Sequence, residues 1–296
     1  MEIVEPAKSS RMRRVVQFPL TRIVLALVFI AVGSLIVAVP ARLFEPMTMK
    51  LLGRPLLETV VYAAALLAML VSYALYVRLV ERRAAGELAL GQLREGVGGS
   101  LVGAAIFSLI IAVLWVLGIY SITGSNGWVT MFGALWIGLF PGISEELIFR
   151  GVLYRIIEES LGTWIALIST SVLFGFAHIA NPGATVFSSV AIALEAGLLL
   201  GMAYTLTKSL WFPMGIHFAW NFVQGGVYGV NVSGLPTPSW LVSKMAGPEL
   251  LSGGAFGAEA SLISVVLCLG LFGIFWFLAQ RRGHIALPFW VRRRLS

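Results

Sequence analysis

The chain has 296 residues, of which 58% are hydrophobic and only 12% are charged, and its mean hydropathy is +0.91. A soluble domain has about 25% charged residues, so this composition excludes a soluble globular protein and indicates an integral membrane protein in contact with a lipid bilayer. The net charge of +7 comes from short basic clusters beside apolar runs, which argues against a nucleic-acid partner because no basic soluble domain is present to bind one.

Eight apolar segments are expected to cross the membrane. The first follows a polar, basic lead and is closed by Arg42 without a small-residue cleavage site, so we interpret it as a retained span and not as a signal peptide. The fold class is therefore all-α: a polytopic membrane protein with about eight transmembrane helices. Their approximate ranges are 23–39, 56–77, 101–120, 128–160, 164–180, 186–207, 214–228 and 262–278.

The connections between these segments also carry signals. Residues 121–127 are rich in Gly and Ser and predict a turn, and 230–260 predict a long loop with a short amphipathic helix. The segment 128–160 is too long for one straight span and is expected to project into the cytoplasm. We divide the chain into 1–99 (basic tail and two transmembrane helices), 100–230 (the motif-bearing core) and 231–296 (loop, last transmembrane helix and basic C-terminal tail).

The distribution of basic residues predicts the orientation. An even number of spans puts both termini on one side, and the excess of Lys and Arg on that side predicts that both are cytoplasmic in the cell membrane. The cytoplasmic set is Lys8, Arg11, Arg13, Arg14, Arg22, Arg78, Arg82, Arg83, Arg94, Arg155, Lys208, Arg281, Arg282, Arg292, Arg293 and Arg294, and the opposite set is only Arg42, Lys50, Arg54 and Lys244.

Two adjacent acids and an arginine interrupt the fourth apolar segment. Ionisable residues inside a span are costly unless they are paired or face a polar cavity, so they indicate a functional site. Glu146 and Arg150 are four residues apart with the acid first, the favoured order for an ion pair. Glu145 points about 100° away and lacks that partner. These residues alone are equally compatible with a structural ion pair.

Further polar residues lie on the next spans. Phe174 and His178 are four residues apart on the fifth span, and His217 and Asn221 are four apart on the seventh, so each pair shares a helical face. Counting from a turn near residue 162, Glu145 and His178 are expected at the same depth. A single membrane histidine more often makes a helix–helix hydrogen bond, but several polar residues in one region favour a site.

Four other residues receive structural interpretations. Glu195 on the sixth span is expected to have a packing or supporting role, and Cys268 is expected to pack in its helix because a single cysteine forms no internal disulfide. Gly197 and Gly201 have the spacing that lets two helices approach closely.

The patterns Glu145-Glu146-x-x-x-Arg150, Phe174-x-x-x-His178 and His217-x-x-x-Asn221 occur in this order. Together they resemble the three motifs of the CPBP family of intramembrane proteases, which includes CAAX-processing prenyl endopeptidases and bacteriocin-processing or immunity proteins. The resemblance covers about 101–229.

This resemblance implies a cofactor-independent endopeptidase that acts on a peptide or membrane-protein substrate, with lipidated substrates included in this family. Glu145, aided by His178, would activate water, and His217 and Asn221 would stabilise the oxyanion. Glu146 and Arg150 would hold the helix and orient Glu145. The chemistry agrees, because a carboxylate in a low dielectric is a better base and paired donors stabilise a tetrahedral intermediate.

Two alternatives stay open. Glu145, His178 and His217 could form a two-histidine, one-carboxylate zinc site of a metalloprotease, although no His-Glu-x-x-His helix is present and Asn221 is a poor zinc ligand. The chain could also be a non-enzymatic scaffold, immunity protein or transporter. The absence of inverted repeats or broken helices argues against a transporter. The sequence does not identify the substrate.

Overall fold

The computed structural model describes residues 11–295, so Lys8 of the expected basic tail lies outside it. Within these residues, seven helices are long and apolar enough to cross a membrane. The protein is therefore an all-α, polytopic integral membrane protein. The candidate spans are Pro19–Leu43, Arg54–Glu81, Leu90–Val116, Trp128–Leu161, Thr163–Ala180, Val186–Thr207 and Leu262–Arg281.

The eighth expected span is a shorter helix. Helix α11 (Trp211–Asn221) has 11 residues and continues into the six-residue π-helix η8 (Phe222–Val227). A straight span needs about 20 residues, so this helix is short for a full crossing. Its side chains are mainly buried within the protein. The described chain thus has seven full-length candidate spans and one short internal helix where eight spans were expected.

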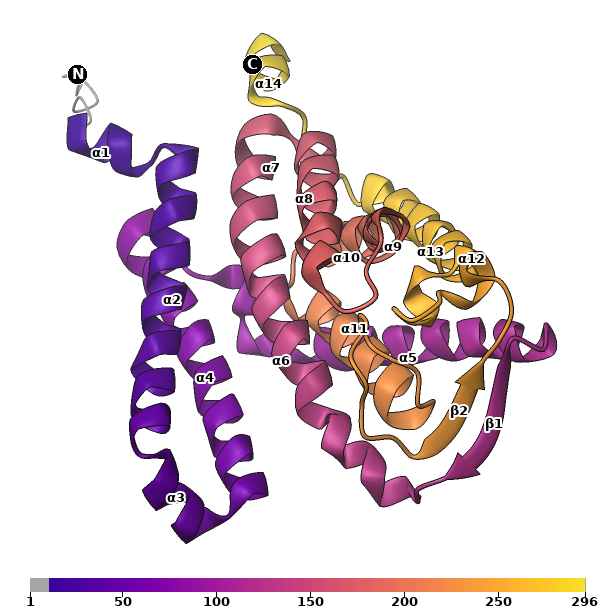
Figure 1. Cartoon of the computed structure of the whole chain (residues 1–296). Coiled ribbons are helices and arrows are strands. Elements are labelled where there is room, and N and C mark those ends of the chain that lie inside the picture. The colour runs from indigo at the N-terminus through magenta and orange to yellow at the C-terminus, as the bar shows by residue number, and fades with distance from the viewer. Residues whose placement is uncertain (1–10, 296) are drawn as a thin grey trace, which may run out of the picture.

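The N-terminal part of the chain forms α1 (Arg11–Val16), α2 (Pro19–Leu43), α3 (Glu45–Leu52) and α4 (Arg54–Tyr76), which continues into the π-helix η1 (Val77–Glu81). The two long helices, α2 and α4, form an antiparallel pair at one side of the molecule (Figure 1, indigo to purple). Gly33 allows α2 to approach α4, because a Cβ atom there would lie 2.0 Å from Ser72 Oγ. The pair is therefore built on a small-residue contact.

Helix α5 (Leu93–Val116) crosses the molecule and packs against α11 (Figure 1). It follows two 3₁₀ turns, η2 (Gly86–Leu88) and η3 (Leu90–Gln92), and begins earlier than the expected start near residue 101. The polar residues there do not end the helix, because glycines bury one face. A Cβ atom on Gly99 would lie 2.1 Å from Phe212 O, and one on Gly103 would lie 2.3 Å from Ile216 O.

The fourth span is one long composite helix, as its length predicted. It comprises the 3₁₀-helix η4 (Trp128–Ala134), α6 (Leu135–Glu146), the π-helix η5 (Leu147–Tyr154) and α7 (Arg155–Leu161). The expected turn occurs at Gly162, which has a φ of 84°. Helix α8 (Thr163–Ala177) then runs back beside α7 and ends in the 3₁₀ turn η6 (His178–Ala180). This turn brings the fourth and fifth spans together as antiparallel neighbours.

The sixth span also contains a π-helical segment. It comprises α9 (Val186–Ile192), η7 (Ala193–Gly197) and α10 (Leu198–Thr207), and a Thr185–Ser188 capping box begins it. A Cβ atom on Gly197 would lie 2.8 Å from Ser171 Cα, and one on Gly201 would lie 2.7 Å from Leu167 Cδ1. Both contacts are with α8, so the expectation of close helix packing at these glycines is confirmed.

The remaining elements close the molecule. Strand β1 (Tyr120–Ser125) pairs antiparallel with β2 (Leu241–Met245), with an irregularity between Ile122 and Gly124. The sequence predicted only a turn and a loop in these regions, because strand pairing over such a separation has no local signal. Helices α12 (Glu249–Ser252), η9 (Ala258–Ala260), α13 (Leu262–Arg281) and α14 (Phe289–Leu295) follow. Cys268 is buried on α13, and α1 and α14 lie at the same end of the molecule (Figure 1).

A buried polar cluster joins the N-terminal pair to α7. Glu81, with a side chain 2% exposed, accepts hydrogen bonds from Arg22 at 2.7 Å and from Arg155 at 2.8 Å. Arg83 bonds both Glu81 and Glu87, at 2.8 and 2.7 Å. Burial of Glu87 acts to raise the pKa of its carboxyl, but hydrogen bonds and charge from Arg83 outweigh it and the pKa is lowered.

Candidate active site

Glu146 connects two of the motif-bearing helices. Its side chain is fully buried, and its Oε1 accepts a hydrogen bond from Arg150 Nη1 at 2.7 Å, which confirms the expected ion pair. The same oxygen lies 2.9 Å from His217 Nδ1 on α11, a contact that the sequence did not predict. Because a carboxylate only accepts, His217 must donate through Nδ1. Glu146 thereby fixes the position of the His217 ring.

Arg150 and Phe174 make further contacts that hold this arrangement in place. Arg150 Nη2 donates to the backbone carbonyls of Ala196 at 2.9 Å and Gly197 at 3.1 Å, so it ties the fourth span to the sixth. Its guanidinium carbon lies 4.7 Å from the centroid of the Phe174 ring. That ring also packs against His178 and His217, with centroid separations of 5.0 and 6.2 Å. Phe174 is therefore a packing residue between both histidines.

Glu145 and His178 lie at the same depth, as the count of helical residues predicted. Glu145 Oε2 is 3.9 Å from His178 Nε2, and the two side chains are 29% and 14% exposed. The other ring nitrogen, Nδ1, is 2.8 Å from the Phe174 carbonyl oxygen and so must carry a proton. Glu145 Oε2 is buried and makes no hydrogen bond to the described residues. In the neutral imidazole, Nε2 is thus an acceptor that faces an unpaired carboxylate oxygen.

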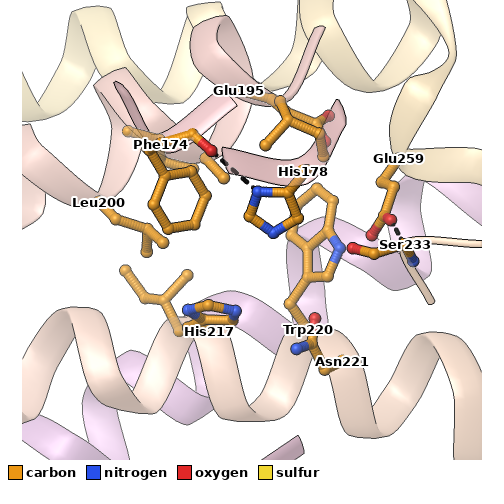
Figure 2. Close-up of a pocket in the computed structure, with 13 residues that line it drawn as sticks. Phe174, His178, Glu195, Leu200, His217, Trp220, Asn221, Ser233 and Glu259 are labelled. Atoms are coloured by element: carbon orange, nitrogen blue, oxygen red, sulfur yellow. Dashed lines mark hydrogen bonds between the residues drawn. The ribbon is translucent and has the colours of Figure 1, made fainter. Parts of the chain in front are cut away.

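A partly open cavity of about 40 Å³ lies between α11 and the elements opposite it. His178, His217 and Asn221 line it, and Figure 2 shows His217 and Asn221 on one side with His178 across from them. A cavity of this size has room for about three waters, at about 10–15 Å³ each. Glu145 does not line this cavity, so the structure brings three of the four expected residues to it and places the fourth beside His178.

Three further acidic or polar residues line the cavity. Glu195 comes from η7, Ser233 from the segment between η8 and β2, and Glu259 from the 3₁₀-helix η9. A supporting role for Glu195 is expected from the sequence, whereas Ser233 and Glu259 were not predicted. The sequence signal for Glu259 is its position just before an apolar span. The burial of Glu259 cannot be read from that signal, because it depends on long-range contacts that fold residues 230–260. Gln224 stabilises that fold by donating to Asn231 O at 2.6 Å.

Three of the four π-helical segments in residues 11–295 lie at these residues. Segment η5 begins directly after Glu146, η8 begins directly after Asn221, and η7 contains Glu195. A π-helical turn holds an extra residue and alters the direction of the side chains that follow, and such turns are frequent at functional sites. Three separate helices thus lose regular α-helical geometry beside the motif residues and Glu195.

The positions of these residues also show how well they could bind one metal ion together. In the part of the chain that the structure describes, no three His, Cys, Asp or Glu side chains are grouped closely enough to hold one. His217 Nδ1 contacts Glu146, and His178 Nδ1 contacts a backbone carbonyl, so each ring has only Nε2 free for a ligand. The set Glu145, His178 and His217 would have to rearrange to bind zinc.

Comparison with known proteins finds a family similarity in the region that contains these residues. Residues 126–223 match the family model described as type II CAAX prenyl endopeptidase, Rce1-like, and this third of the chain contains all three motifs. No curated protein and no solved structure matches the chain. Residues 126–223 are therefore similar to CAAX-type prenyl endopeptidases, a family of peptide-bond hydrolases.

Proposed function

We propose that this endopeptidase cleaves membrane-associated peptides that end in a prenylated cysteine motif, with Glu145 and His178 activating the attacking water. The observation that carries the proposal is the 3.9 Å separation between Glu145 Oε2 and His178 Nε2, beside a cavity lined by two further polar motif residues. The match to prenyl endopeptidases supports the substrate class.

The separation between these two groups suits a shared water. At 3.9 Å the atoms are too far apart for a direct hydrogen bond, and a water between them can interact with both. Because His178 Nδ1 donates to the Phe174 carbonyl, the ring orientation is fixed with Nε2 toward Glu145. Glu145 would accept a proton as the water oxygen attacks the substrate carbonyl, and His178 would orient that water.

His217 and Asn221 are placed to stabilise the resulting oxyanion. With Nδ1 held by Glu146, the His217 ring turns Nε2 away from that contact, and the Asn221 amide lines the same cavity. A protonated Nε2 and an amide N–H are two donors to the developing negative charge. Glu146 would stabilise the imidazolium, since its carboxylate lies 2.9 Å from Nδ1. Donors in such a water-poor site contribute about 2.7–4 kcal/mol each to catalysis.

Peptide hydrolysis on a prenylated substrate is directly measurable. Purified protein in liposomes should cleave a farnesylated peptide with the motif Cys-aliphatic-aliphatic-X and release the last three residues, detected by mass spectrometry. The same peptide without its farnesyl group tests the contribution of the lipid. Cleavage of neither peptide would contradict the proposal, and equal cleavage of both would contradict the prenyl preference.

The scheme uses no metal ion, and zinc dependence is tested separately. Elemental analysis of the purified protein and assay after chelation are expected to give no stoichiometric zinc and unchanged activity. Stoichiometric zinc together with loss of activity on chelation would support a metalloprotease. In cells, Glu145→Gln should abolish the biological output. An unchanged output would support a scaffold or immunity role.

We further propose that both termini are cytoplasmic. The residues of α1 and α14 lie at the same end of the molecule, and both helices carry basic residues (Figure 1). Anionic lipid and the positive-inside bias favour that end on the cytoplasmic side. Reporter fusions that are active only outside the cytoplasm should give no signal at either terminus. A signal at one terminus would contradict this topology.

A further inference from the structure

Two carboxyl groups of the cavity have no role in the proposed water activation. Glu195 is 1% exposed and Glu259 is 3% exposed, and both line the cavity with His178 and His217. Figure 2 shows them on the side of His178, across from the helix that carries His217 and Asn221. The cavity therefore has one side that donates to an oxyanion and an opposite side that is rich in carboxyl groups.

Glu195 lines the cavity and has one buried oxygen without a hydrogen-bond partner. Its Oε2 is buried and makes no hydrogen bond to any described residue, and no basic side chain in the described chain forms an ion pair with it. The fourth span carries a buried cation, Arg150, but that guanidinium is used by Glu146 and by the carbonyls of Ala196 and Gly197. A carboxyl buried without a cation is costly to ionise, so it retains its proton.

Glu259 occupies a different environment. Its Oε1 accepts a hydrogen bond from the Ser233 backbone N–H at 2.5 Å, which fixes the side chain in the loop. Burial nevertheless raises the pKa of the Glu259 carboxyl. Two carboxyl groups that face one small cavity cannot both ionise without repulsion. Because Glu259 accepts an N–H and Glu195 Oε2 has no donor, Glu195 Oε2 is the better position for a proton.

Peptide hydrolysis needs a proton donor on the side of the cavity where Glu195 lies. When the tetrahedral intermediate collapses, the departing nitrogen must be protonated, because an amide anion is a very poor leaving group. With the oxyanion directed to His217 and Asn221, the other substituents of the tetrahedral carbon face the opposite side. We propose that Glu195 is a further catalytic residue, a general acid whose carboxyl donates a proton to the leaving amine, and that Glu259 is a positioning residue that keeps Glu195 protonated.

The step balances without any co-reactant. Water transfers one proton to Glu145, and its oxygen bonds to the carbonyl carbon. The C–N bond then breaks, its electron pair remains on nitrogen, and the Glu195 O–H proton bonds to that nitrogen. The products are an amine and a carboxylic acid, with Glu145 protonated and Glu195 ionised. Transfer of one proton from Glu145 to Glu195 through water restores the enzyme. This role rests on the proposed peptidase function.

Infrared spectroscopy tests the protonation of Glu195 without a substrate. A protonated carboxyl has a C=O stretch that a carboxylate lacks, so the wild-type spectrum at neutral pH should contain a protonated-carboxyl band that Glu195→Gln removes. Glu249→Gln, which replaces an exposed acid in the same loop region as Glu259, is the control and should leave the band unchanged. A wild-type spectrum from which Glu195→Gln removes only carboxylate absorption would overturn the assignment.

A comparison of amide and ester hydrolysis tests the catalytic step. The substrates are the farnesylated peptide and its analogue with an ester at the scissile bond, whose alkoxide leaves with far less need of a proton. Glu195→Gln should lower kcat for the amide by about 100-fold or more and change kcat for the ester by only a few fold. Glu259→Gln should lower amide hydrolysis less. Equal losses on both substrates, or unchanged amide hydrolysis in a folded variant, would overturn the proposal.

These results separate the inference from the proposed function. If wild-type protein cleaves neither substrate, the proposed substrate class fails, and the infrared measurement still decides whether Glu195 holds a proton. If wild type cleaves both and Glu195→Gln shows no amide–ester difference, only the general-acid role fails. Glu195→Asp retains an acid on a shorter side chain and should recover part of the amide activity that Glu195→Gln loses.

Discussion

His217 Nδ1 lies 2.9 Å from Glu146 Oε1, the oxygen that also accepts from Arg150 at 2.7 Å. This contact joins the first motif to the third, between two residues that are 71 positions apart in the sequence. It gives Glu146 a role beyond the expected helical ion pair: the acid orients the ring that faces the cavity. In the proposed mechanism, stability and catalysis therefore depend on the same carboxylate.

Glu146→Gln should be strongly destabilising. The substitution leaves the buried Arg150 guanidinium without its counter-charge, and breaking a buried pair in this way costs about 3–5 kcal/mol. Denaturant unfolding in detergent measures the loss. The double variant Glu146→Gln/Arg150→Met removes the uncompensated charge and should recover part of that stability. A double variant less stable than Glu146→Gln would contradict the explanation from charge.

Asn221→Ala should impair catalysis much more than folding. Loss of one oxyanion donor is expected to lower kcat about 100- to 1,000-fold, with KM changed by a few fold at most. Steady-state kinetics on the farnesylated peptide measure both parameters. Asn126→Ala, which removes an amide in the loop near β1, serves as the control and should retain activity. A raised KM with unchanged kcat would assign Asn221 to substrate binding.

Gly103→Ala should displace α11 and disturb its two site residues. The added Cβ atom would lie 2.3 Å from Ile216 O, directly before His217, and overpacking of this kind costs about 1–3 kcal/mol. Both the melting temperature and the cleavage rate should fall. Gly270→Ala on α13 is the matched control, because no atom lies within 4 Å of the new Cβ. It should be neutral or stabilising by about 0.5–1 kcal/mol. Similar losses in both variants would contradict this account of helix packing.

Stability should fall in acid through Glu87. Its folded pKa lies below the ordinary value of 4.5, chiefly because Arg83 overcomes the effect of burial. Ionisation of Glu87 therefore stabilises the fold at pH values above 4.5, and this contribution is lost as the pH falls through the lower folded pKa. The melting temperature of the wild type should decline more steeply below pH 4.5 than that of Glu87→Gln. Parallel curves would show that Glu87 contributes no such linkage.

The sequence was sufficient for features that depend on local spacing. Glu146 and Arg150 form their ion pair because four residues make one helical turn, and Glu145 reaches the level of His178 because the turn at Gly162 is equidistant from both. The apolar runs also predicted the helices that contain these residues. Residue type and helical period are enough for such relationships, since each depends on one helix or one short turn.

Features that depend on long-range contacts could not be read from the sequence. The hydrogen bond between His217 and Glu146 requires the close approach of α11 to the fourth span, which Gly138 and Gly142 permit by packing against Phe218. The burial of Glu259 requires a loop fold held by contacts such as Gln224 to Asn231. Neither has a helical period or a local turn signal, so the sequence predicts only Arg150 as a partner of Glu146 and does not predict Glu259 as a site residue.

The central claim is that Glu145 activates water for peptide hydrolysis. The most direct measurement is the single-turnover rate of farnesylated-peptide cleavage by wild type, Glu145→Gln and Glu58→Gln in liposomes, with folding checked by melting temperature. Glu58 is a half-exposed acid on α4 that pairs with Arg54, so its substitution is the control. We predict that Glu145→Gln lowers the rate by at least about 100-fold while Glu58→Gln has the wild-type rate. A folded Glu145→Gln protein that cleaves at the wild-type rate would contradict the account.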